Sequence, residues 1–367
     1  MRILVAPDSF KECLSAAEIA EIIGETAGKY GHAAVKIPVA DGGEGFAEAL
    51  AKYTNADKII VDAHDALMRP LKAPYYVTPA GTVILEAADT FGLARIEANR
   101  RDPLLTTTFG MGEQIIHALN AGHRDFIIGL GGSATNDCGI GLMQALGFIL
   151  TDRNGAPLPR GAAGKDLSAV SRIVAPDIEM NVTLAVDVSN PLFGPNGAAA
   201  VYAPQKGADE SAVSALENGA KAFFQTMEDA LNKKIPLCAG LGAAGGAGLP
   251  FYAYFNTRLK SGIDLILDHS PFEKALSNAD LVITGEGRID AQTVFGKVPA
   301  GVAKRCGKVP VIAVCGCTGA GYESVYRAGI KAVYPITPPS TPFEQAKANA
   351  PLYLKETVVK ILKEYAF

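Results

Sequence analysis

The chain has 367 residues, and 49% of them are hydrophobic, so it is long enough for about two domains that each bury a core without disulfides or a structural metal. Its formal net charge is −4, from 34 Lys and Arg against 38 Asp and Glu, which predicts no general attraction to nucleic acid or to anionic lipid. The sequence has no apolar stretch of about 18 residues, no leader of the secretory type and no zinc-site spacing among its six cysteines, so we expect a cytoplasmic protein without a membrane span.

The first 65 residues predict two strand–helix units followed by a third strand. Ser15 and Glu18 have the spacing of a capping box, so the first helix is expected to begin there. Strands that alternate with helices along the chain indicate a parallel sheet. The expected strands are residues 2–6, 35–40 and 58–63, and the second helix is expected at residues 46–52.

The same alternation returns near the C-terminus, where three short β-branched runs are each followed by a turn rich in Gly or Pro. These runs are residues 281–284, 309–314 and 332–336. The segment between the two ends has strand candidates of its own at residues 83–85, 125–130 and 182–186.

We therefore expect an α/β protein of two α/β domains. A Rossmann-like parallel-sheet domain would be built from residues 1–65 and 261–367, with a second α/β domain, residues 66–260, inserted into it. Chains of this kind commonly place the ligand in the cleft between the domains, so the active site is expected there.

Five of the expected strands end in loops that carry carboxylates beside glycine, hydroxyl or basic groups. One Asp-Gly pair after a strand is ordinarily a turn, but five such loops at strand ends indicate a ligand site. In open parallel sheets, ligands bind outside the carboxyl ends of the strands. The loops are PDSFK (7–11), DGGEG (41–45), GLGGSATND (129–137), DVSNP (187–191) and GEGRID (285–290).

These residue types suit phosphoryl transfer. Glycines let backbone amides approach an anion, and nearby carboxylates suit Mg²⁺, which binds through one or two protein oxygens and the substrate phosphates. The loop at residues 129–137 is the strongest phosphate candidate. A second glycine-rich loop, residues 240–248, could contact a nucleotide or could instead allow close packing of backbone. Neither a Walker sequence nor the protein-kinase motifs are present.

Taken in order, the motifs resemble those of the type-1 glycerate kinase family of bacteria. The resemblance spans nearly the whole chain, with APDSFK (6–11), PVADGGEG (38–45), GLGGSATND (129–137), DVSNPLFG (187–194), PQKGA (204–208), GAAGGAG (242–248) and VITGEGRIDAQTVFGKVPAGVA (282–303). The chain departs from the family pattern in three places. Glu12-Cys13 stands where the family usually has Gly-Ser, Cys138 where it usually has Gly, and Ala247 where it has a bulkier residue.

The resemblance implies ATP and Mg²⁺ as cofactors, glycerate as the acceptor, 2-phosphoglycerate as the product, and the split α/β fold. From their places at strand ends, the candidate catalytic residues are Asp187, Lys11 and Asp8, with Asp187 either the general base or a Mg²⁺ ligand. The candidate substrate- or phosphate-binding residues are Gly131, Gly132, Ser133, Thr135, Asn136, Asn190, Lys206 and Arg288. The candidate metal ligands are Asp41, Glu286 and Asp137.

Other functions on the same scaffold stay open at this point. The nearest alternatives are a glycerate 3-kinase and a kinase of another small hydroxy acid. A non-catalytic anion-binding module is disfavoured, because carboxylates repel an anion unless a metal intervenes. The expected partners are glycerate and ATP, with no nucleic acid or membrane, and a homodimer is an open arrangement.

Overall fold

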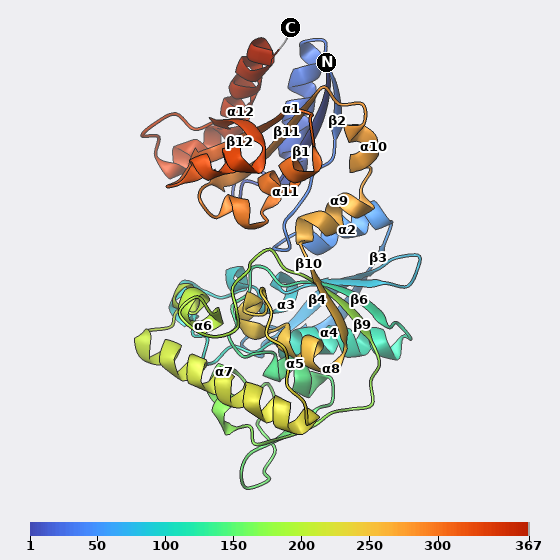
Figure 1. Cartoon of the computed structure of the whole chain (residues 1–367), viewed down its shortest axis with the longest axis vertical. Coiled ribbons are helices and arrows are strands. Elements are labelled where there is room, and N and C mark those ends of the chain that lie inside the picture. Colours follow the sequence, from blue (N-terminus) through green and yellow to red (C-terminus); the bar gives the residue numbers. More distant parts are fainter. Residues whose placement is uncertain (366–367) are drawn as a thin grey trace. The chain divides into compact units, whose positions relative to one another are not determined.

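The computed structural model describes residues 1–365 and divides the chain into two compact units (Figure 1). The first unit contains Met1–Asp41 and the described residues from Ser261 onward, and the second contains Gly42–Lys260. Each unit has helices packed on a sheet, so the expected α/β class is confirmed. Of the helices in residues 1–365, none has the length and apolar character needed to cross a membrane.

The first boundary between the units lies at Asp41 and not at residue 65, so the expected boundary is corrected. Strand β3 (Asp57–His64) pairs along its whole length with β4 (Pro70–Val77), and helix α2 (Phe46–Thr54) packs against β5 (Val83–Glu86). Residues 42–65 therefore share the sheet and core of the second unit, because β3 forms a hairpin with the strand that follows it in sequence. The expected cleft site stays a prediction.

The first unit is built on a parallel sheet in the order β13-β12-β11-β1-β2. Strand β1 lies between β11 and β2, so strands from both ends of the sequence are direct neighbours. Most of its residues are buried, as expected for a parallel strand covered on both faces. The strands are β1 (Arg2–Pro7), β2 (Ala33–Lys36), β11 (Leu281–Ile289), β12 (Val311–Thr318) and β13 (Ile330–Pro335).

Helices cover this sheet with apolar faces. Helix α1 (Ala16–Lys29) begins at the capping box of Ser15 and Glu18, as expected from the sequence. It packs against α12 (Phe343–Tyr365), and both contribute to one buried cluster with residues of the central strands. The helices α9 (Gly262–His269), α10 (Phe272–Leu276) and α11 (Val298–Arg305) follow the return of the chain into this unit.

The second unit contains a mixed sheet in the order β10-β9-β6-β5-β4-β3. Strands β5, β6, β9 and β10 run parallel to one another. The hairpin of β3 and β4 extends the sheet beyond β5, with β4 antiparallel to β5 and β3 antiparallel to β4. The remaining strands are β6 (Asp125–Gly129), β9 (Asn181–Ala185), β10 (Asn256–Lys260) and a separate pair, β7 (Ile149–Thr151) and β8 (Arg172–Val174). The helices are α3 (Ala88–Phe91), α4 (Phe109–Asn120), α5 (Ile140–Ala145), α6 (Ala198–Tyr202), α7 (Glu210–Leu231) and α8 (Leu249–Tyr254).

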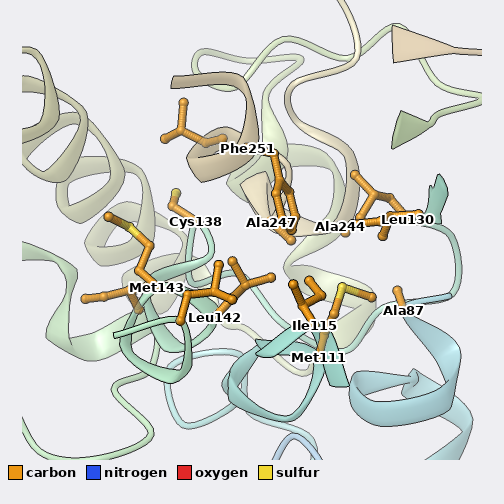
Figure 2. Packing of buried hydrophobic residues seen from close by; sticks show 14 of the residues in the cluster. Ala87, Met111, Ile115, Leu130, Cys138, Leu142, Met143, Ala244, Ala247 and Phe251 are labelled. Atoms are coloured by element: carbon orange, nitrogen blue, oxygen red, sulfur yellow. The ribbon is translucent and has the colours of Figure 1, made fainter. Parts of the chain in front are cut away.

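The glycine-rich loop at residues 240–248 is explained by close packing. Three consecutive residues, Ala244, Gly245 and Gly246, have φ angles of 52°, 66° and 82°. A Cβ atom on Gly245 would lie 2.2 Å from the carbonyl oxygen of Thr135, so only glycine fits there. Figure 2 shows Ala244 in the same buried cluster as Cys138. Backbone packing therefore accounts for this loop without a nucleotide.

Two departures from the family pattern fall at left-handed backbone positions. Glu12 has a φ of 61° and Cys138 a φ of 48°. Glycine adopts this conformation without strain, whereas a residue with a Cβ atom is destabilised by about 1–2 kcal/mol. The backbone conformation thus favours glycine at both positions. Because this chain has Glu12 and Cys138 there, its backbone is strained at both.

Replacing Glu12 by glycine should stabilise the protein. We expect Glu12→Gly to raise the free energy of unfolding by about 0.5–1 kcal/mol, because relief of the left-handed strain outweighs the added freedom of the unfolded chain. Urea unfolding of the two proteins would measure the difference. The matched control is Glu12→Ala, which removes the charge but keeps the Cβ atom. An equal gain in both variants would assign the effect to charge and contradict the strain.

Candidate active site

Three carboxylates lie near one another at the carboxyl ends of β1 and β11. Because the two strands are parallel and in register, with Pro7 opposite Gly285, Asp8, which follows β1, comes beside Glu286, which lies within β11. Both are buried, with exposed fractions of 8% and 6%. Burial and the nearby Asp41 raise the pKa of Asp8 to about 7, and Glu286 adds to the rise. The structure thus brings together three acids that the sequence placed at strand ends.

Asp8 also has partners that favour its ionised form. Its Oδ1 atom accepts hydrogen bonds from the backbone N–H of Ser9 at 2.6 Å and from the Ser9 hydroxyl at 3.3 Å. The positive charge of Lys11 also lowers the pKa of Asp8. These effects are weaker than burial and the repulsion from Asp41, so the carboxyl holds its proton up to near neutral pH.

The carboxylate of Glu286 interacts with two residues that the sequence analysis did not identify. The hydroxyl of Thr293 donates to Oε1 at 2.5 Å, and Nζ of Lys297 lies 3.4 Å from Oε2. Burial raises the pKa of Glu286, while Lys297 and Thr293 lower it. Both partners lie in the motif VITGEGRIDAQTVFGKVPAGVA, so the signal was in the sequence, but their contacts with Glu286 needed the structure.

Arg288 lies apart from this arrangement of buried groups. Its side chain is 64% exposed, and its Nε atom is 3.6 Å from a carboxylate oxygen of Asp290. The residue therefore presents a cation to solvent near the end of β11. Its binding of phosphate or substrate stays a prediction.

In the second unit, the loop that follows β6 is held by backbone hydrogen bonds. The N–H groups of Gly131, Ala134 and Cys138 donate to the carbonyl oxygens of Gly42, Phe91 and Gly245, at distances of 2.9, 2.7 and 3.0 Å. Amides that are bonded in this way cannot also bind phosphate. The loop is a rigid scaffold at these positions rather than an open row of free amides.

Lys206 reaches this loop from inside the unit. Its Nζ atom donates to Oγ of Ser133 at 2.9 Å and to the carbonyl oxygen of Thr135 at 2.6 Å, and the residue is only 2% exposed. Burial lowers the pKa of Lys206 to about 7, and the nearby Asp137 opposes this shift. Lys206 therefore holds the Ser133 side chain through this hydrogen bond. Its direct contact with an anion stays a prediction.

Two buried residues of the loop have polar atoms without partners in the described part of the chain. These atoms are Oγ1 of Thr135 and both Oδ1 and Nδ2 of Asn136, and the residues are at most 1% exposed. Buried polar groups are nearly always hydrogen-bonded, so such atoms indicate a missing partner, either water or a ligand. Both residues were expected to bind substrate or phosphate, and these open positions are consistent with that prediction.

Asp137 accepts several hydrogen bonds from protein donors at the start of α5. Its side chain accepts hydrogen bonds from the N–H and hydroxyl of Thr108 at 2.8 and 2.9 Å, and from the N–H groups of Gly139 and Gly141 at 3.0 and 3.4 Å. The residue is fully buried. These bonds tie Asp137 to Thr108 and to the start of α5, and its expected role as a metal ligand stays a prediction.

The DGGEG segment is bound to the strand ends of the second unit. The N–H of Gly42 donates to the carboxylate of Asp187, and the carbonyl oxygen of Gly42 accepts from Gly131 at 2.9 Å. A Cβ atom on Gly42 would lie 2.7 Å from Oδ2 of Asp187, so the glycine is required for this approach. Asp187, at the end of β9, is partly exposed, which leaves it accessible to a ligand.

Glu86 is a further buried acid that the sequence analysis missed. It ends β5 and accepts hydrogen bonds from the N–H groups of Gly45 at 3.0 Å and Ala47 at 2.7 Å, so it caps the N-terminus of α2. Burial raises its pKa to about 7. No motif marks it, because a glutamate after a strand is common, and its role depends on where α2 begins.

Asn190 mainly stabilises its own loop. Its side chain accepts from the hydroxyl of Tyr202 at 2.6 Å and donates to the carbonyl oxygen of Asn196 at 2.9 Å. The expected contact of Asn190 with substrate stays a prediction.

The carboxylates of the first unit fit a divalent cation chemically. Among residues 1–365, no three His, Cys, Asp or Glu side chains form a preformed metal site. Mg²⁺ needs only one or two protein carboxylates, since it keeps waters and binds the substrate phosphates. A cation would also relieve the repulsion that raises the pKa of Asp8. Asp8, Asp41 and Glu286 are thus the groups that could hold Mg²⁺.

Comparisons with known proteins give the same family across the chain. The model of the Glycerate kinase family matches residues 3–366. A glycerate kinase of Bacillus subtilis is 43% identical over 365 residues, which cover 97% of this chain and 96% of that protein. A glycerate 2-kinase of Escherichia coli is 39% identical, with 92% and 90% covered. A solved structure described as a glycerate kinase 2, from Salmonella typhimurium, superposes with a TM-score of 0.82 at 37% identity and covers 99% of this chain and 98% of that one.

The raised pKa of Asp8 predicts a pH-dependent loss of stability. Its pKa is about 7 in the folded protein and 3.8 in the unfolded chain, so between these values the folded state holds a proton that the unfolded state has released. Stability should therefore fall as the pH rises from about 4 to about 7. With a chelator present, Asp8→Asn should be more stable than the original at pH 8 by at least about 1 kcal/mol, and the difference should shrink toward pH 4. Thermal melting across this range measures it, and a difference independent of pH would contradict the assignment.

Proposed function

The chain belongs to the glycerate kinase family, and we propose that it transfers the γ-phosphate of ATP to glycerate, giving 2-phosphoglycerate and ADP. The observation that carries the proposal is the group of acids Asp8, Asp41 and Glu286 beside β1 and β11, two of them buried, in a chain that matches this family over residues 3–366. The relative from Escherichia coli is named a glycerate 2-kinase, which supports phosphorylation at the 2-position.

In the proposed reaction, the 2-hydroxyl oxygen of glycerate forms a bond to the γ-phosphorus, and the bond between that phosphorus and the β–γ bridging oxygen breaks. The hydroxyl proton passes to a carboxylate, and ADP leaves with the electron pair of the broken bond. Mg²⁺ held by the acids of the first unit would neutralise charge on the phosphates. The work of the protein is then to orient the reactants and to accept one proton.

Asp187 is the carboxylate that we assign to the proton. It lies two residues after the end of β9, is partly exposed, and accepts a hydrogen bond from the N–H of Gly42. In the same unit, Ser133 and the adjacent Gly132 are proposed to contact the substrate, with Lys206 donating a hydrogen bond to Ser133.

The choice of hydroxyl requires a fixed carboxylate. Glycerate has a primary 3-hydroxyl that is intrinsically more accessible than the secondary 2-hydroxyl. A cation that clamps the carboxylate would hold the adjacent 2-hydroxyl at a set distance from the phosphate. Lys11 and Arg288 are the exposed cations at the strand ends of the first unit, and we propose that one of them has this role.

The position of the new phosphate can be tested with a coupled assay. Enolase accepts 2-phosphoglycerate but not the 3-isomer, so phosphoenolpyruvate should form from ATP, Mg²⁺ and glycerate without any phosphoglycerate mutase. Formation only after mutase is added would show a 3-kinase. Parallel reactions with lactate, tartronate and hydroxypyruvate should be slower, and preference for one of these would overturn glycerate as the acceptor. ATP turnover with no acid at all would be equally contradictory.

The assignment of Asp187 predicts a loss of turnover. Asp187→Asn should lower kcat by at least about 10²-fold, the usual effect of losing a general base, because the amide keeps the hydrogen bond but accepts no proton. Steady-state kinetics measure it, with melting temperature as the check on folding. Asp177→Asn changes an exposed aspartate of the same unit and should leave kcat unchanged. A folded Asp187→Asn enzyme with near-normal kcat would remove Asp187 from the mechanism.

A further inference from the structure

Strand β3 forms one edge of the six-stranded sheet in the second unit (Figure 1). On its inner side it pairs with β4 over all eight of its residues, Asp57–His64, without a register shift. Alternate residues of an edge strand direct their backbone N–H and C=O groups away from the sheet, where another strand can bind them. Proline, a β-bulge or a short length commonly protects such an edge, and Asp57–His64 has none of these protections.

One face of β3 is exposed and the other is packed on the core. Lys58, Ile60 and Asp62 share the exposed face, because alternate residues of a strand point to the same side. Ile60 is 60% exposed, although isoleucine is among the residues most often buried. On the other face, Val61 belongs to the core of the second unit and Ile59 packs against it.

These residues make β3 complementary to a second copy of itself. In antiparallel pairing about a two-fold axis at Ile60, Lys58 of each chain lies opposite Asp62 of the other, and the two Ile60 side chains meet on the axis. On the core face, Ile59 of each chain then lies opposite Val61 of the other. Moving the axis by one residue in either direction would place Ile60 opposite a charged residue and would lose both Lys–Asp pairs. The charges therefore select this register.

The contacts that Lys58 and Asp62 make within the chain are compatible with this pairing. Asp62 forms an ion pair with Lys72 of β4 at 2.7 Å, and its side chain is 85% exposed. Nζ of Lys58 lies 5.7 Å from the centroid of the Tyr76 ring. Exposed contacts of this kind contribute little to stability, so the side chains can turn toward a second chain at small cost. Asp62 could then lie between two cations.

The opposite edge of the same sheet does not have this complementarity. Strand β10 (Asn256–Lys260) has Arg258 at its centre, so two copies paired about that centre would bring like charges together, which is destabilising. We propose that β3 is a dimer interface, in which two copies of this chain pair their β3 strands antiparallel about Ile60 and join their sheets into one. This inference is independent of the proposed function.

Sedimentation velocity tests whether the dimer forms. A pair of strands buries less surface than a standard interface, so we expect reversible association with a Kd of about 10–100 μM that weakens as salt screens the charges. Loading concentrations of about 5–500 μM cover this range. A chain that stays monomeric at the highest concentration would overturn the inference.

Charge reversal tests the register. Lys58→Asp places only acidic side chains opposite one another and Asp62→Lys only basic ones, so each variant alone should associate at least about 10-fold more weakly. An equal mixture of the two variants should restore the dimer, because every acidic position then faces a basic one. A chain with both substitutions should dimerise for the same reason. Weakened single variants that neither the mixture nor the double substitution restores would overturn this register.

A substitution on the axis tests the contact between the two isoleucines. Ile60→Lys brings like charges together there and should raise the Kd by at least about 10-fold. The matched control is Ile149→Lys, which changes an isoleucine of β7 in the same unit that is 57% exposed, and it should leave the Kd within about 2-fold of the original. Melting temperature checks that each variant is folded. A dimer that survives Ile60→Lys, or that is lost in folded Ile149→Lys, would overturn the assignment to β3.

Discussion

Electrostatic repulsion among buried carboxylates is the constraint on which the chemistry of the first unit depends. Parallel pairing of β1 and β11 places Asp8, which follows β1, beside Glu286, which lies within β11, and burial and Asp41 raise the pKa of Asp8 to about 7. A fold that needed only stability would place apolar or single charged groups there. A bound cation would relieve this repulsion, so the raised pKa of Asp8 supports the proposal that a ligand binds here.

In the second unit, glycine serves backbone packing more than direct contact with a ligand. Gly42, Gly131 and Gly245 all lie where a Cβ atom would collide with backbone or with the Asp187 carboxylate. The loop after β6 is therefore packed closely against Gly42 and Gly245, and several of its amides donate to backbone carbonyl oxygens. Among the described residues of this region, the side chain of Asn136 has polar atoms without a partner, and Asp187 is partly exposed. Rigid loops of this kind fix a few side chains accurately rather than surround a phosphate with free amides.

The sequence predicted most of what depends on local patterns. The capping box at Ser15 and the apolar strands β1 and β11 carry their own signals, and strand-end logic identified Asp8, Asp41 and Glu286. Strand β4 was missed because Pro70 and Pro74 interrupt it, and β10 because its residues are mostly polar. The boundary at Asp41 depends on β3 pairing with β4, and the roles of Lys297 and Asp137 depend on which atoms they meet. Such pairings are set by tertiary structure, and no local pattern encodes them.

The two strained backbone positions, Glu12 and Cys138, each lie next to a charged residue of the candidate site. Glu12 lies one residue after Lys11 in a left-handed conformation, and Cys138 has the same conformation one residue after Asp137. Both left-handed conformations therefore lie beside residues of the candidate site, while the buried cores of each unit are apolar. Unfavourable local terms persist only where the surrounding structure over-determines the conformation. The well-packed sheets supply that support, so the loops at their carboxyl ends can hold carboxylates and backbone shapes that would be unstable elsewhere in the chain.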